Sequence, residues 1–270
     1  MKAILFILLS ILWLGANAQN SPGVQQISLR ADAAEIKVDG KLTEWDDALQ
    51  AYNKICEISY SIANSPDYLY LAIQAKDPQI IKKIIVGGLA FTINTSGTKK
   101  DKNAAVITFP FYEKGQNHPY VTLETASEIK KGDANYQLRW DSLINTSNSK
   151  IKSGYKFIGT SGLKNIAEEM IPVYNTEGIS AAAMLDNNLH YNFELAIPLK
   201  LLNDSSTLKT LAYNIKLNGH AFGGSDLKDS GRFVMWIGRD GQNYRMEDSS
   251  PRSWSLASPT DFWGEYTLAK

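Results

Sequence analysis

The residues of this chain best suited to chemistry are aromatic rings that stand close to planar polar side chains. A sugar ring has an apolar C–H face and a rim of hydroxyl groups, so its binding site needs an aromatic platform edged by polar groups. One stretch combines these groups in the residues Trp236, Arg239, Asp240, Asn243 and Tyr244. It is the first candidate for a sugar-contact region. A strand with a solvated hairpin turn at Asp240-Gly241 explains the same residues equally well.

The orientation of each tryptophan decides whether its ring can serve as a platform. Trp236 alternates with apolar residues at positions 233, 235 and 237, so it faces outward if they face the core. Trp140 lies among polar residues and has less need to be buried, which makes it the second candidate. Trp45 stands at a strand-helix junction, where packing against the core is the stronger interpretation. Trp263 can face either side of its strand.

Acidic side chains in two regions could hold a calcium ion through their carboxylate oxygens. Asp226 and Asp229 lie in a loop rich in glycine, aspartate and serine, and Asp240 follows this loop. They match no EF-hand spacing, so a solvated loop is the stronger interpretation. A second cluster, with similarly weak support, comprises Asp39, Glu44 and Asp46. Structural calcium is the one cofactor that these patterns suggest.

The sequence carries no clear catalytic signature. Glu168 and Glu169 are adjacent on an expected helix and point about 100° apart, so they form a poor acid/base pair. Neither a nucleophile elbow nor a glycine-rich phosphate loop is present. The three histidines are too dispersed for a metal motif, although His190 and His220 could converge in space. A glycoside hydrolase with carboxylates from distant strands, or a haem carrier, is therefore only an alternative.

Period-two alternation of apolar residues predicts the strands that must position these groups. In residues 189–197 the apolar and aromatic side chains share one face, which predicts a half-buried strand. The pattern recurs in residues 36–38, 69–75, 89–93, 211–217, 233–237 and 262–268. Turn residues separate these segments. The chain is therefore predicted to be all-β, an antiparallel β-sandwich of jelly-roll type.

One or two short helices are expected beside the sheets. Asp77 is a fitting N-cap for a helix with Pro78 at its first position, and isoleucines at helical spacing follow until Gly87-Gly88 stops it. A second short helix is expected at residues 165–170, ending before Pro172.

The N-terminus predicts export. Lys2, an apolar run and the pair Ala16 and Ala18 are typical of a cleavable signal peptide in residues 1–18, and the run is shorter than the roughly 20 residues that span a bilayer. We expect cleavage after Ala18 and a secreted or periplasmic protein, with an uncleaved anchor as the alternative. Residues 19–30 are expected to form a flexible lead-in, and residues 31–270 a single domain.

Charge and cysteine content narrow the function further. The chain has 28 basic and 28 acidic residues, whereas nucleic-acid binders usually carry a basic excess, so a nucleic-acid partner is not expected. Cys56 is the one cysteine, so the fold must be stabilised by core burial without an internal disulfide. A lone cysteine of this kind is more often a small buried hydrophobe than a catalytic thiol.

Several segments resemble one known family. Residues 35–48 suggest an edge strand, a turn at Asp39-Gly40 and a short helix begun by Thr43, and they resemble the opening of the family 9 carbohydrate-binding modules. Residues 67–78, 191–199 and 262–268 resemble later framework strands of that family. The similarity spans nearly the whole mature chain and is nearest to divergent, DOMON-like secreted relatives. It implies a β-sandwich that holds sugar between exposed aromatic rings, often with structural calcium nearby.

These observations together favour a secreted, non-catalytic carbohydrate-binding domain that stacks a glycan on exposed aromatic rings. The expected partners are a glycan or oligosaccharide and a polysaccharide-degrading enzyme system. The main alternative is an exported structural or partner-binding sandwich that has no sugar site.

Overall fold

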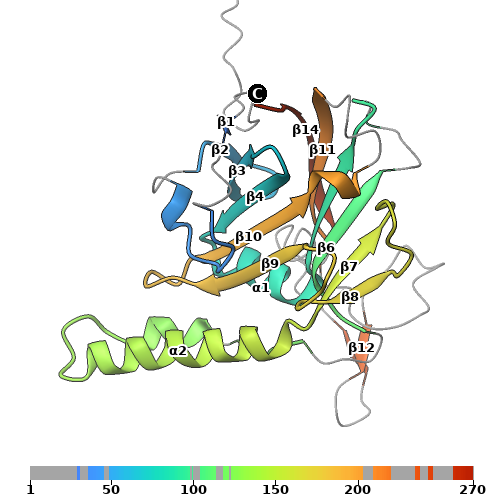
Figure 1. Cartoon of the computed structure of the whole chain (residues 1–270). Helices are drawn as coiled ribbons and strands as arrows, with labels where there is room; N and C mark the ends of the chain where they lie inside the picture. Colours follow the sequence, from blue (N-terminus) through green and yellow to red (C-terminus); the bar gives the residue numbers. More distant parts are fainter. Residues whose placement is uncertain are drawn as a thin grey trace, which may run out of the picture.

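The computed structural model of the chain describes residues 29–30, 36–45, 49–97, 99, 104–113, 118–121, 123–202, 209–219, 235–237, 243–245 and 258–269. Residues 1–28 lie outside these ranges, so the signal peptide stays a prediction. Most of the described strands form two sheets that pack face to face (Figure 1). The predicted β-sandwich is confirmed. Among the described residues, no helix has the length and hydropathy that crossing a bilayer requires.

Sheet A forms the first layer. Its strands are β1 (Leu29–Arg30), β2 (Ala51–Asn53), β3 (Ile58–Asn64), β4 (Tyr68–Ala75), β9 (Ser180–Leu185) and β10 (Tyr191–Pro198). They run in the order β1-β3-β4-β10-β9, with β2 also paired to β3. All pairs are antiparallel except β1 with β3. The expected lead-in therefore ends in a short strand, because Leu29 and Arg30 pair with β3.

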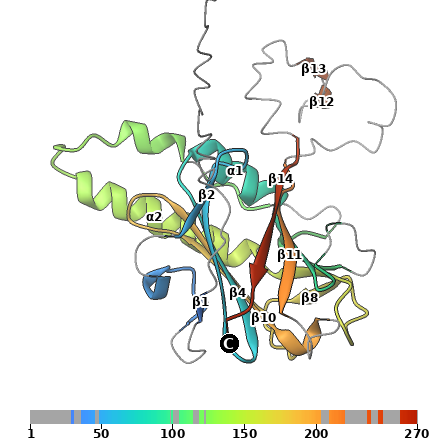
Figure 2. The same ribbon diagram turned by 90° about the horizontal axis from the view of Figure 1, so that it is seen from above.

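Sheet B forms the second layer, and Figure 2 shows the two sheets side by side from above. Its strands are β5 (Leu89–Asn94), β6 (Ala105–Phe111), β7 (Phe157–Ser161), β8 (Met170–Pro172), β11 (Thr210–Leu217) and β14 (Thr260–Thr267). They run in the order β14-β11-β5-β6-β7-β8, and every pair is antiparallel. A separate two-stranded sheet pairs β12 (Met235–Ile237) with β13 (Asn243–Arg245).

The core lies between the two sheets and is rich in aromatic rings. Tyr60 of sheet A and Tyr213 of sheet B are fully buried, and their hydroxyl oxygens are 3.1 Å apart in a hydrogen bond that joins the layers. Gly264 lies against Tyr213, where a Cβ atom would collide with the phenol ring. Phe91 and Phe193 fill the interior from opposite sheets. Alternation along the strands thus sorts the side chains as the sequence predicts.

The outer face of sheet A is also covered, which the sequence did not predict. Residues 36–45 lie on the side of this sheet away from sheet B (Figure 2). Their Trp45 packs with residues of β3, β4 and β10 in a second apolar cluster, joined by Ile36 and Val38. Every residue of β10 is therefore buried, and the expectation of a half-buried strand was wrong. Residues 36–38 were expected to form a strand, but they cover the sheet without pairing to it.

Three short 3₁₀ helices and two α-helices complete the described elements, namely η1 (Thr43–Trp45), η2 (Glu124–Glu128), η3 (Leu199–Leu201), α1 (Pro78–Gly87) and α2 (Tyr136–Gly154). Helix α1 is confirmed together with its cap, since the Asp77 carboxylate accepts hydrogen bonds from the backbone of Gln79 and Ile80. The short helix η1 begins at Thr43 as predicted.

Helix α2 and the segment before β8 differ from the predictions. Helix α2 has 19 residues but buries only Ile144, Ser147 and Ile151, so its sequence shows a weak apolar stripe. It packs beside β9 in an insertion between β6 and β7 (Figure 1). The helix expected at residues 165–170 is absent from this described segment. Backbone carbonyls at Glu168 and Glu169 instead accept hydrogen bonds from Thr160, which holds the chain extended beside β7.

Candidate functional site

The first predicted site lies largely in the hairpin of β12 and β13. The backbone pairing places Trp236 opposite Tyr244, and Ile237 opposite Asn243, so Trp236 lies in a strand as expected. Arg239 and Asp240 fall outside the described residues. The pairing brings the backbones of Trp236, Asn243 and Tyr244 together, and a sugar-binding role for these five residues stays a prediction.

Trp140 projects from helix α2 as a half-buried side chain. Its Nε1 atom donates a hydrogen bond of 2.8 Å to the carbonyl oxygen of Asn187, in the turn between β9 and β10. The ring stacks on Tyr136, with centroids 5.8 Å apart and planes 20° from parallel. Trp140 therefore helps to attach α2 to sheet A. Its role in glycan binding is a separate question and stays a prediction.

Trp263 faces outward from the sandwich, which resolves the orientation that the sequence left open. Its neighbour Phe262 and the later Tyr266 are buried in the core, so alternation along β14 places Trp263 on the outer face of sheet B. The side chain is half-buried. The register aligns Trp263 with Asn214 on β11, and Asn214 in turn with Thr92 on β5.

Polar side chains flank Trp263 on this outer face. Asp261 and Glu265 lie two residues to either side of it on β14, point to the same side of the sheet and are exposed. Lys216 of β11 stands opposite Asp261 in the register. Asn214 is held between these strands, because its Nδ2 atom donates hydrogen bonds to Oδ2 of Asp261 at 2.6 Å and to the carbonyl oxygen of Phe262 at 3.0 Å.

The neighbouring strands present small or short side chains to the same face. In the register these are Ala90 and Thr92 on β5, and Val106 and Thr108 on β6. On β7, Phe157 is half-buried on this face, and the ring of Phe111 lies over Gly159. Large rings therefore stand on β14 and beside β7, with shorter side chains between them. We define the Trp263 face as six outward-pointing residues of sheet B, namely Thr92, Asn214, Lys216, Asp261, Trp263 and Glu265.

The Trp263 face is suited to binding and poorly suited to hydrolysis. An indole provides apolar contact area, while the carboxylates, amide and ammonium can bond to hydroxyl groups. Asp261 and Glu265 are four residues apart on one strand, which separates their backbones by about 13 Å. Paired carboxylates in glycoside hydrolases are about 5 to 9.5 Å apart. The geometry thus favours recognition of a polar, ring-shaped ligand.

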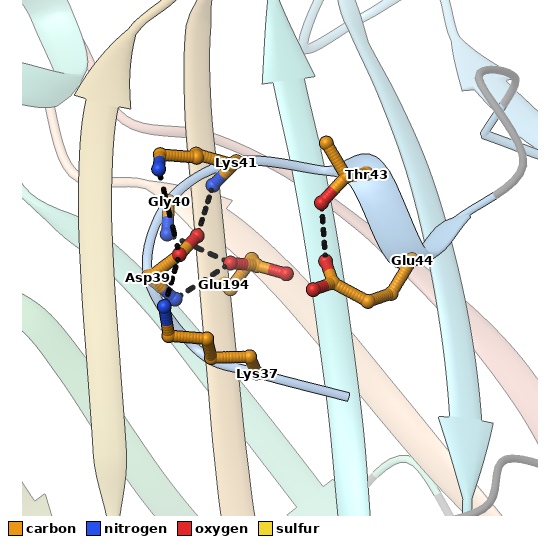
Figure 3. A network of polar contacts seen from close by, with 7 residues as sticks. All are labelled: Lys37, Asp39, Gly40, Lys41, Thr43, Glu44 and Glu194. Atoms are coloured by element: carbon orange, nitrogen blue, oxygen red, sulfur yellow. Dashed lines mark hydrogen bonds and ion pairs between the residues drawn. The ribbon is translucent and has the colours of Figure 1, made fainter. Parts of the chain in front are cut away.

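A second polar cluster is centred on Glu194 and holds residues 36–45 in place (Figure 3). Glu194 is 1% exposed, and its carboxylate accepts hydrogen bonds from three donors, the backbone nitrogens of Asp39 at 3.0 Å and Gly40 at 2.7 Å and Nε1 of Trp45 at 2.9 Å. Burial raises the pKa of Glu194, and these hydrogen bonds oppose the rise. In the sequence, the one sign of this structural role is that a glutamate stands within an apolar strand.

The acidic residues near Glu194 bond to neighbouring groups within the chain. Asp39 pairs with Lys37 at 3.1 Å, and Glu44 accepts a hydrogen bond from the Thr43 hydroxyl at 2.9 Å. Asp46, Asp226 and Asp229 lie outside the described residues. Within the described ranges, no group of three or more histidine, cysteine or acidic side chains is arranged to hold a metal ion. The calcium sites stay predictions.

The described histidines lie apart from the Trp263 face. His190 Nδ1 is 3.4 Å from Oδ2 of Asp186 in the β9–β10 turn, and the His118 ring contacts Tyr112 edge-on. His220 lies outside the described residues, so its convergence with His190 stays a prediction.

Comparisons with known proteins find similarity among solved structures. No family model matches the chain, and no curated protein matches it. A solved structure of a family 9 carbohydrate-binding module from Caldicellulosiruptor kristjanssonii, in complex with glucose, is similar over 90% of this chain and 95% of that one. The identity is 10% and the TM-score 0.37. A likeness this distant does not show membership of that family, so the family resemblance stays a prediction. The candidate site is therefore inferred from this chain's own residues.

Proposed function

We propose that this protein is a non-catalytic glycan-binding module that stacks a sugar ring on Trp263. The observation that carries the proposal is the half-buried indole on the outer face of sheet B, flanked along β14 by two exposed polar side chains. The ring would contact the apolar face of a sugar, while Asp261, Glu265 and Asn214 would bond to its hydroxyls.

The shape of the Trp263 face favours an extended chain over a small, enclosed ligand. The short side chains of β5 and β6 leave a surface between Trp263 and the rings of Phe111 and Phe157, along which further sugar residues can lie. A site with one aromatic platform and exposed polar groups should bind weakly, with a Kd on the order of 1 mM for a short oligosaccharide. A polysaccharide would be retained more strongly because it offers many equivalent sites.

The sequence-based predictions extend this proposal. Trp140 and the β12–β13 hairpin, with Trp236 and Tyr244, are proposed as additional glycan contacts. Export after cleavage at Ala18 would place the module beside polysaccharides and the enzymes that degrade them. Structural calcium bound by Asp226 and Asp229 is proposed on the same sequence grounds.

Affinity electrophoresis tests the proposal directly. The protein would be run through gels that contain hydroxyethylcellulose, xylan, arabinogalactan or polygalacturonate, and at least one glycan should retard it. Trp263→Ala should abolish the retardation while the thermal unfolding temperature changes little. Tyr174→Ala is the matched control, because Tyr174 is 91% exposed and follows β8, which is at the opposite edge of sheet B from β14.

Two outcomes would contradict the proposal. The first is that no glycan in the panel retards the protein, which would favour a structural or partner-binding sandwich. The second is that Trp263→Ala binds as the natural protein does. Trp140→Ala and Trp236→Ala, run in parallel, would then show whether binding occurs at helix α2 or at the β12–β13 hairpin.

A further inference from the structure

The charges on the Trp263 face restrict the kind of glycan that it can hold. Along β14, Asp261 and Glu265 each stand two residues from Trp263, which is about 7 Å along a strand. Both carboxylates are exposed on the side of the sheet to which the indole points. A sugar stacked on this ring would therefore lie between two negative charges.

Within the described strands of sheet B, cationic groups offset these charges only in part. Lys216 is the one basic residue among the outward positions of the described sheet B strands, and it stands opposite Asp261. Asn214 donates a hydrogen bond to Asp261, which orients the carboxylate and leaves its charge in place. At Glu265 the opposite residue on β11 is Ala212, which offers no charge. The end of the face around Glu265 is therefore negative.

We infer that the Trp263 face selects glycans without acidic groups and discriminates against polymers of uronic acids. This inference rests on the glycan-binding function proposed above. Hydroxyl groups of a neutral sugar, or the ammonium of an amino sugar, can donate hydrogen bonds to Asp261 and Glu265. A uronate carboxylate has no proton to donate and would stand close to two like charges.

The size of the discrimination follows from Coulomb's law. Two like charges about 7 Å apart in water at low salt weaken binding roughly threefold, so two carboxylates should weaken it roughly five- to tenfold. The repulsion acts between exposed groups, and the Debye length falls from about 10 Å at 0.1 M salt to about 3 Å at 1 M. The preference for neutral glycans should therefore be strong at low salt and small at high salt.

A pair of polymers with the same backbone isolates the effect of charge. Retardation would be measured in gels with hydroxyethylcellulose or carboxymethylcellulose, which share the cellulose backbone, at 20 mM and 500 mM NaCl. At low salt the neutral polymer of a pair should bind at least fivefold more tightly than the acidic one. The ratio should approach one in the double variant Asp261→Asn, Glu265→Gln, and at high salt in the natural protein.

A single variant keeps the test independent of any effect on folding. Asp261 bonds to Asn214, whereas Glu265 is exposed, so Glu265→Gln alone should fold normally and reduce the ratio about threefold. Equal binding of neutral and acidic polymers by the natural protein, abolished in both cases by Trp263→Ala, would overturn the inference and leave the glycan-binding proposal intact. Retardation by no polymer would overturn both. An unchanged ratio in both carboxylate variants would also overturn the inference.

Discussion

The indole Nε1 atom of Trp45 donates a hydrogen bond of 2.9 Å to Oε1 of Glu194, which follows 149 residues later in the chain. Both groups are buried on the outer face of sheet A. The second carboxylate oxygen of Glu194 accepts hydrogen bonds from the backbone of Asp39 and Gly40. One buried carboxylate thus fixes the segment that converts β10 from a surface strand into an interior strand.

Removal of this carboxylate should destabilise the protein. Glu194→Ala leaves three donors without their acceptor, so we expect a loss of about 3 kcal/mol in the free energy of unfolding. Urea unfolding followed by tryptophan fluorescence measures it. Trp45→Phe, which removes one donor and keeps most of the packing, should cost less, about 1 to 2 kcal/mol. A Glu194→Ala variant as stable as the natural protein would contradict this account of the segment.

Glu194 should also leave a signature in the pH dependence of stability. Its pKa is raised by burial in the folded state, so the protonated carboxyl is favoured by folding. The stability it contributes is fully present below the unfolded pKa of about 4.3 and is lost as pH rises through the folded pKa. Glu194→Gln cannot titrate. The natural protein should therefore lose stability relative to Glu194→Gln as pH rises across that window. If it gains stability relative to Glu194→Gln instead, folding lowers the pKa of Glu194.

Cys56 should be inert in the native protein. It is fully buried, and burial raises the pKa of its thiol to about 11 against the opposing effects of Thr260 and Lys83. At pH 8 about one thiol in a thousand would be ionised, and reagents cannot reach it. Reaction with a chromogenic disulfide should be at least a hundredfold slower in buffer than in 6 M urea. Rapid stoichiometric labelling of the folded protein would place Cys56 at the surface.

Helix α2 should depend on Asn148 for its attachment to sheet A. The Asn148 side chain donates to the carbonyl oxygen of Leu185 at 2.9 Å and accepts from its backbone nitrogen at 2.7 Å. Asn148→Ala should lower the free energy of unfolding by about 1 to 3 kcal/mol and speed hydrogen exchange in α2. Ser142→Ala is the control, since Ser142 is exposed on the same helix and alanine favours helix. Equal exchange in both variants would refute this role.

The position of Trp263 illustrates how far the sequence could lead to the candidate site. Phe262 and Tyr266 share one face of β14, and both are buried, so alternation alone could have placed Trp263 outside. The partners of the indole could not be found in this way. Asn214 and Lys216 come from β11, and only strand pairing and register bring them beside β14. The sequence could therefore identify Trp263 as an outward-facing residue, but not the residues of other strands that surround it.

Local sequence patterns missed helix α2, which is present, and predicted a helix at residues 165–170, which is absent. Helix α2 is largely polar, and its attachment depends on contacts such as that between Asn148 and Leu185, which no spacing along the chain reveals. Residues 165–170 have a pattern that favours helix, yet the hydrogen bonds with Thr160 keep the chain extended. In residues 165–170, tertiary hydrogen bonds therefore outweigh the local preference.

The sequence by itself determined the β-sandwich, the capped helix α1 and the burial of Trp45 and Cys56, because each depends on alternation, capping or hydrophobicity within a short window. Tertiary structure alone decided that residues 36–45 cover β10 and that Trp263 shares a face with Asn214, Lys216 and Glu265. The physical reason is that a local pattern fixes which side chains lie on one face of a strand. Which distant segment covers that face, or leaves it open, is fixed only when the whole chain packs.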